Sequence, residues 1–195
     1  MSAHDRAPLQ LNPSDITLDR PGRWMTPALL AAVIGLAGTV GIVMTGGVTM
    51  ERFYRSYLVA FMYCLSLCLG GLFFVLVTHL VRAAWSVVIR RMAEVLSLGV
   101  LPMGLGVLVV IFGMHDLYEW THTEVVANDP ILQHKAPWLN STFVIARLVF
   151  YFRAWSVLAF YFHTRSARQD TTRDPKLTMS MERFAAPGVI VFALT

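Results

Sequence analysis

Long runs of apolar residues alternate with short polar segments along this chain, and the alternation defines its class. Four runs cover residues 27–45, 57–81, 95–112 and 142–162. A helix rises 1.5 Å per residue, so about 20 apolar residues cross the roughly 30 Å hydrocarbon layer of a membrane. A fifth run, residues 185–195, has only 11 residues before the sequence ends. The pattern predicts an all-α, polytopic membrane bundle with four complete transmembrane helices and a truncated fifth.

The polar segments predict the domain organisation and the orientation. Residues 1–26 form a polar N-terminal segment, and residues 27–195 form the transmembrane domain. Eleven Lys and Arg residues lie in segments 1–26, 82–94 and 163–184. Only three, Arg52, Arg55 and Lys135, lie in the other connections between apolar runs. Cytoplasmic connections are the more basic ones in membrane proteins. We therefore expect a cytoplasmic N-terminus and an outer loop at residues 113–141.

Composition agrees with a membrane protein. The chain is 56% hydrophobic and 14% charged, against about 25% charged in an average soluble domain. Its net charge of +4 lies mainly in the connections, so we expect contact with the lipid bilayer and none with nucleic acid. Cys64 and Cys68 lie inside an apolar run, where they form neither a disulfide framework nor a metal site. Packing of small residues, with Gly71, against a neighbouring helix is the favoured role.

The connection at residues 113–141 is long, and such loops are usually functional or disordered. Its aromatic residues argue against disorder. Two interpretations remain, a solvated loop with interfacial tryptophans and a lid or docking surface for a partner outside the membrane. The residues concerned are Tyr118, Trp120 and Trp138, with the titratable residues His115, Asp116, Glu119, His122, Glu124, Asp129 and His134.

Ionisable side chains inside apolar runs are costly and commonly mark functional sites. Arg147 lies about one turn inside the outer end of the fourth run, Tyr151 shares its face, and Arg153 lies near mid-span. Asp116 or Glu119, at the end of the third run, is expected to approach Arg147. Two interpretations follow. One is a polar pocket for a quinone headgroup or for proton entry, and the other is a structural ion pair that closes a helical hairpin.

Two histidines end apolar runs on the same, inner side of the membrane. His79 ends the second run and His163 ends the fourth. Histidines on different helices at one depth could be axial ligands of a b-type haem. The favoured alternative places both rings at the membrane margin, among headgroups or in a water chain.

Several segments, taken together and in order, resemble a known family. They are residues 56–94, which include AWSVVIRRMAE, then HDLYEWTH at 115–122, DP at 129–130, HK at 134–135, WLN at 138–140 and SARQD at 166–170. The set resembles the ActF-type quinone-binding membrane subunits of bacterial alternative complex III, a quinol:cytochrome c oxidoreductase. These subunits are similar to the NrfD-like and polysulfide-reductase membrane proteins. The likeness covers nearly all of the chain after about residue 25.

The resemblance implies a larger fold of two consecutive four-helix bundles, of which this chain supplies a leading helix and most of the first bundle. It implies a multi-pass subunit of the bacterial inner membrane that is not catalytic alone. The implied ligand is quinone or quinol, with no covalently bound cofactor, and the implied partners are other membrane subunits and outer iron–sulfur and haem subunits. The end of the third helix and the loop after it (His115, Asp116, Tyr118, Glu119 and His122) would face those outer subunits.

Two functions compete on these grounds. The first is a subunit of a quinol-oxidising respiratory complex that contributes quinone-binding or proton-path surface and a docking surface. Its candidate residues are His79, His115, Asp116, Glu119, Arg147, Tyr151 and Arg153. The second is a purely structural membrane anchor of that complex. A haem b carrier and a transporter are less favoured, and neither a catalytic residue nor a metal site is predicted in the chain.

Overall fold

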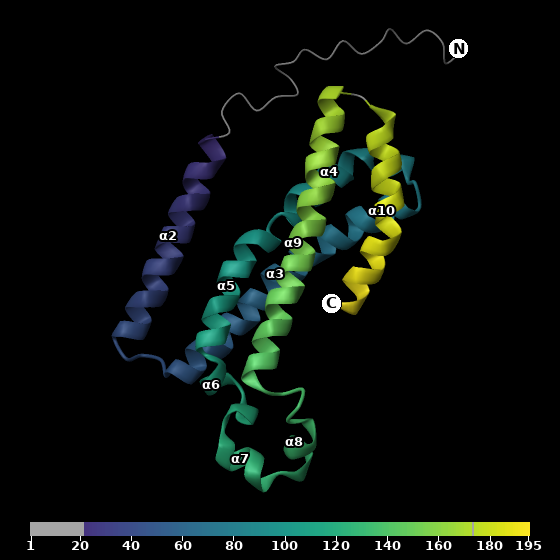
Figure 1. Ribbon diagram of the computed structural model, residues 1–195. Helices are drawn as coiled ribbons and strands as arrows, with labels where there is room; N and C mark the ends of the chain where they lie inside the picture. Colours follow the sequence, from purple (N-terminus) through teal and green to yellow (C-terminus); the bar gives the residue numbers. More distant parts are fainter. Residues whose placement is uncertain (1–21, 173) are drawn as a thin grey trace, which may run out of the picture. The chain divides into compact units, whose positions relative to one another are not determined.

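The computed structural model describes residues 22–172 and 174–195 (Figure 1). This described part is helical and contains no strand. Five of its helical segments are long and apolar enough to cross a membrane. The prediction of an all-α, multi-pass membrane protein is therefore confirmed at that level. Most of the predicted N-terminal segment, residues 1–21, lies outside the described residues.

The chain divides into two units, Met1–Thr49 and Met50–Thr195. The first unit holds a single described helix, α2 (Gly22–Met44). The second unit holds all the residues discussed below. Its main helices are α3 (Met50–Leu80), α4 (Val87–Ser97), α5 (Val100–Phe112), α9 (Ser141–Thr172) and α10 (Pro175–Leu194).

Two helices continue well beyond their apolar runs. The fourth run was expected to end at residue 162, but α9 continues to Thr172. The next helix begins at Pro175, after Asp174 caps it by accepting a hydrogen bond from the Lys176 backbone N–H at 2.9 Å. Polar residues end an apolar run without ending the backbone hydrogen bonds of a helix, so the expected inner connection is mostly helical. The fifth candidate span is consequently 20 residues long rather than 11.

The segment expected to be a polar connection at 82–94 also forms structure. α3 ends where Arg82 takes a positive φ of 51° and the Ala83 N–H donates to the Thr78 carbonyl at 3.0 Å. This is the hydrogen bond of a Schellman turn, which commonly ends helices. A 3-10 turn (Ala84–Ser86) leads into α4. With α5, this helix forms the candidate span Ile89–Phe112.

Small residues allow α3 to approach α4 closely. A Cβ atom added at Gly71 would lie 2.9 Å from the Ala93 carbonyl oxygen, and one added at Gly99 would lie 2.6 Å from the Cys68 sulfur. Cys68 is buried, whereas Cys64 is exposed. The packing role expected for the two cysteines and Gly71 therefore holds for Cys68 and Gly71, and Cys64 faces outward.

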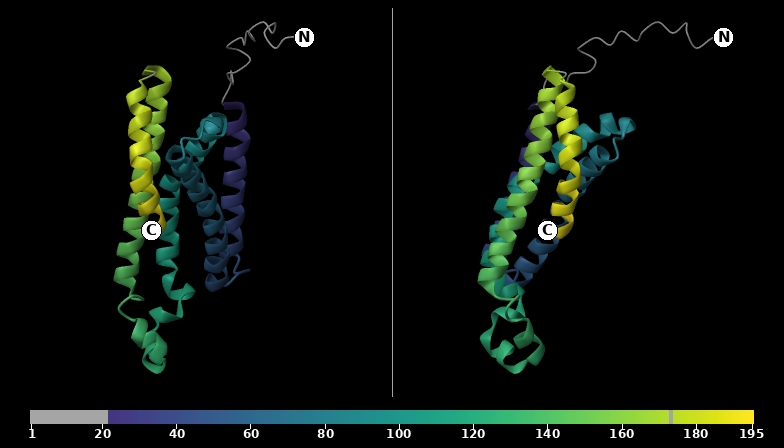
Figure 2. Two further views of the ribbon diagram at one scale, coloured as in Figure 1. Left: turned by 90° about the vertical axis from the view of Figure 1, so that its right-hand side faces the viewer. Right: turned by 45° about the vertical axis from the view of Figure 1, so that its right-hand side comes forward.

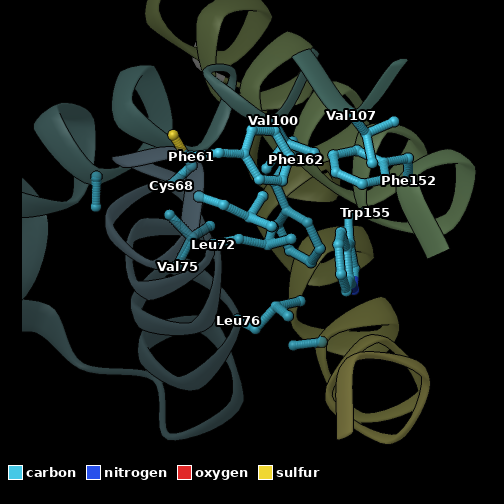
Figure 3. Close-up of a cluster of buried hydrophobic side chains, with 14 of the residues drawn as sticks. Phe61, Cys68, Leu72, Val75, Leu76, Val100, Val107, Phe152, Trp155 and Phe162 are labelled. Atoms are coloured by element: carbon cyan, nitrogen blue, oxygen red, sulfur yellow. The ribbon is translucent and has the colours of Figure 1, made fainter. Parts of the chain in front are cut away.

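The core of the second unit lies where α3, α9 and α10 meet. Leu72, Val75 and Leu76 of α3 are fully buried, as are Ala159 of α9 and Ala185 of α10. Figure 3 shows the α3 side chains gathered with the aromatic side chains of α9. Of these helices, α3 and α9 also line the cavity described below.

The expected outer loop is built from short helices: α6 (Met114–Leu117), the 3-10 turn η2 (Glu119–Thr121), α7 (Thr123–Asn128) and α8 (Pro130–Lys135). It lies at the end of the unit opposite the turn between α9 and α10 (Figure 2). Asp129 caps α8 by accepting from the Ile131 N–H at 2.8 Å, and Asn140 accepts from the Phe143 N–H at 2.8 Å as α9 begins. Side-chain caps thus define these helix starts.

Candidate functional site

A cavity of about 350 Å³ lies between α3, α5 and α9. It lies beside the segment that runs from α6 to α8 (residues 114–135), called the short-helix segment below. Cavities of roughly this size, with apolar walls and few polar groups, are typical of small-molecule sites. Apolar and aromatic side chains form most of this wall. The side chains with polar atoms come from the short-helix segment and from α9. They are Tyr118, Trp120, Arg147 and Trp155.

Arg147 is half-buried and is the charged side chain among the residues that line the cavity. Its guanidinium lies 5.5 Å from the centroid of the Phe143 ring, a cation–π contact. None of the ion pairs between described residues involves Arg147, and both Asp116 and Glu119 are exposed. The expected pairing of Arg147 with either carboxylate is therefore not found. The cation faces an apolar cavity instead.

The short-helix segment directs its aromatic and its charged side chains differently. The rings of Tyr118 and Trp120 stack at 5.5 Å, and both line the cavity. The rings of His115 and His122 stack at 4.1 Å, and the Thr121 hydroxyl lies 3.3 Å from His115 Nδ1. The segment therefore forms one wall of the cavity and presents a polar surface elsewhere.

Two further predicted residues lie on α9 outside the cavity wall. Tyr151 is half-buried, with its ring 5.9 Å from the Trp155 ring. Arg153 is exposed, and no carboxylate of the described residues pairs with it. The structure brings Arg147 and Tyr118 to one cavity but leaves Arg153 on the surface of this unit.

A second polar cluster, which the sequence analysis did not single out, surrounds Glu94. This side chain is 1% exposed. Its carboxylate lies 3.1 Å from Arg91 Nη1 and 3.8 Å from Arg90 Nε. Arg91 also donates to the Ser166 hydroxyl at 3.2 Å and to the Asp170 carboxylate at 2.7 Å. The cluster ties α4 to the last turns of α9.

His79 lies inside the bundle, among protein side chains. It is 2% exposed, and its ring lies 5.3 Å from that of Phe162. No described residue forms a hydrogen bond with the buried atoms His79 Nε2, Glu94 Oε1 or His163 Nδ1. The ring is therefore enclosed by protein rather than open to headgroups, while the position of His79 at the membrane margin stays a prediction. Buried polar atoms of this kind are commonly satisfied by water, so a water chain remains a fitting role.

Among the described residues, no group of three or more His, Cys, Asp or Glu side chains is placed to hold a metal ion. Comparison with models of known protein families finds no match for this chain. Comparison with curated proteins finds no match either. Function is therefore inferred from the residues and their geometry.

Proposed function

We propose that this protein is an integral membrane subunit of a quinol-oxidising respiratory electron-transfer complex in the bacterial inner membrane, of the ActF type and with an NrfD-like fold. It binds quinone or quinol and docks iron–sulfur and haem subunits, with its N-terminus in the cytoplasm. The observation that carries the proposal is the apolar cavity that holds Arg147 and is walled by the short-helix segment.

The cavity offers what both the apolar skeleton and the ring oxygens of a quinone require. Its apolar wall accommodates the ring and the start of an isoprenoid tail, and the N–H groups of Arg147 and Trp120 can donate to the ring oxygens. Met62 lines the cavity and is 53% exposed. The cavity therefore opens onto the surface of the bundle, where a lipid-soluble molecule arrives.

Quinol oxidation releases two protons and two electrons for each quinol. Asp116, Glu119 and His115, next to the cavity wall, supply carboxylate and imidazole groups, the kinds of group that accept protons in general base catalysis. The electrons pass to a redox centre of the partner docked on the short-helix segment. Tyr151, Arg153 and His79 are the candidate contributors of this chain to a proton path through the bundle.

Replacement of Arg147 tests the cavity directly. We expect Arg147→Gln to weaken the binding of a quinone by about tenfold, which corresponds to roughly 1.4 kcal/mol, because a charge-assisted hydrogen bond to the ring is lost. The measurement is competition against a photoreactive quinone in the purified complex. Arg55→Gln is the matched control, since Arg55 pairs with Glu51 and does not line the cavity. Equal affinity of the two variants would rule out the proposed site.

A structural anchor is the second candidate, and one observation favours it. Asp116 and Glu119 are exposed on the short-helix segment and have no ion-pair partner among the described residues. Both carboxylates are thus available to a docked protein. Their surface position fits an assembly contact as well as it fits proton release.

The double variant Asp116→Asn, Glu119→Gln separates the two functions. If these groups accept protons, turnover should fall by about a hundredfold or more while the complex still purifies intact. Subunit composition and quinol oxidation are measured on the same preparation. Glu182→Gln, which removes a carboxylate from α10 and so lies outside the short-helix segment, is expected to change neither. Loss of the outer subunits from the double variant would instead establish the anchor.

A further inference from the structure

Several arginines lie at the end of the unit that holds the α9–α10 turn. Some of them pair with a carboxylate and others do not. Arg90 and Arg91 on α4 lie 3.8 and 3.1 Å from the carboxylate of Glu94. Arg165 and Arg168 on α9 have no carboxylate within ion-pair distance among the described residues. Two positive charges are therefore left uncompensated on one helix, three residues apart and on neighbouring positions of its surface.

One of these two cations is held in a fixed orientation. The Arg165 guanidinium lies 4.1 Å from the centroid of the Tyr161 ring, and its Nη1 donates to the Ser180 hydroxyl at 2.6 Å. Neither contact neutralises the charge, and the guanidinium keeps N–H donors beyond the one that Ser180 uses. Arg165 is thus pre-organised to receive an anion, with exposed Arg168 beside it. Pre-organisation lowers the entropic cost of binding.

A groove of about 550 Å³ runs along α9 from these arginines toward the middle of the helix. It includes Val157, which is 62% exposed, and Phe160, which is 59% exposed. Between Ser156 and Arg168 the helix rises by about 18 Å. One end of the groove is therefore cationic, and the rest is mostly apolar and belongs to a helix suited to cross a membrane.

We propose that this groove binds an anionic phospholipid. Arg165 and Arg168 hold the phosphate, since guanidinium groups donate paired hydrogen bonds to phosphate oxygens, and an acyl chain lies along Val157 and Phe160. All the residues that line the groove belong to α9, and basic residues just outside a membrane-spanning stretch attract anionic headgroups. The occupant is a lipid rather than an acidic peptide, because the apolar part of the groove lies on a membrane-spanning segment. The site stands independently of the proposed quinone function.

The test is native mass spectrometry of the full chain in detergent, titrated with phosphatidylglycerol or with phosphatidylcholine. We expect the unmodified protein to retain phosphatidylglycerol about tenfold better, and the variant Arg165→Gln, Arg168→Gln to lose that preference. The matched control is Lys176→Gln, Arg183→Gln. It removes two charges from α10 without touching the groove, and it should keep the preference.

Three results would overturn the proposal. They are an unmodified protein that does not distinguish the two lipids, a control that loses as much as the groove variant, and retention of inorganic phosphate in place of the lipid. Arg168→Gln alone guards against misfolding, because the exposed Arg168 side chain makes no ion pair with described residues. It should lower the preference about threefold in a protein that remains helical by circular dichroism, and an unchanged preference in that variant would also overturn the proposal.

Discussion

Replacing Glu94 with alanine is expected to destabilise the bundle by about 3–5 kcal/mol, the cost of breaking a buried ion pair from one side. The carboxylate is 1% exposed and lies between Arg90 and Arg91. Its removal leaves Arg90 and Arg91 without the buried carboxylate that both pair with. It also weakens the hold of α4 on α9, because Arg91 bridges Glu94 to Asp170.

Unfolding of the purified protein in detergent measures this effect, followed by circular dichroism against denaturant. Glu182→Ala is the matched control: that carboxylate pairs with Arg82 at 3.0 Å, but the arginine side chain is 76% exposed. Exposed pairs contribute about 0–1 kcal/mol, so the control should remain close to the unmodified protein. If both variants lose the same stability, Glu94 does not have the role assigned to it.

Two adjacent glycines should respond in opposite directions to the same substitution. At Gly71 a Cβ would lie 2.9 Å from the Ala93 backbone oxygen, whereas at Gly70 it would meet nothing within 4 Å. Gly71→Ala should therefore lower stability by about 1–3 kcal/mol through overpacking. Gly70→Ala should raise stability by about 0.5–1 kcal/mol, because alanine loses less backbone entropy in a helix.

The comparison needs only the thermal midpoints of the two variants in the same detergent. A fall for Gly71→Ala with a rise for Gly70→Ala would establish the close approach of α3 to α4. A rise for both would show that the two helices are not in contact at this point.

The number of membrane helices was predictable from apolar runs, but their ends were not. A run stops at the first cluster of charges, whereas α9 continues through Arg165 and Arg168 to Thr172. Backbone hydrogen bonds continue wherever no residue interrupts them. The true start of α10 is indicated by Asp174 and Pro175, a capping signal that hydropathy does not register.

The candidate site was predicted in part. Arg147 was identified because a charge inside an apolar run is exceptional. Its expected ion pair with Asp116 or Glu119 is not found; α6 ends at Leu117, and the backbone of Tyr118 after it is extended (φ −128°, ψ 119°). Asp116 and Glu119 are exposed on either side of this break, while Tyr118 contributes to the cavity wall. Such a change of direction depends on one residue and has no periodic signal.

Glu94 was missed for a different reason. It lies at the edge of an apolar run, where charged residues are ordinarily taken to be solvated. The spacing of Arg90, Arg91 and Glu94 at i+4 and i+3 is a signal for helical pairing, but burial depends on how α3 and α9 pack around α4. His79 illustrates the same limit, since its 2% exposure is produced by helices distant in sequence.

The length of α9 has a consequence for biogenesis. Its 32 residues extend about 48 Å, so several turns project beyond a hydrocarbon layer of roughly 30 Å. Arg165 and Arg168 lie on that projecting part, and Arg91 reaches it through Asp170. On the proposed orientation these arginines belong to the charge excess that retains the segment on the cytoplasmic side during insertion. Arg91 and Arg165 also join the finished helices, through Asp170 and Ser180, so on that orientation one group of charges would serve both insertion and helix packing.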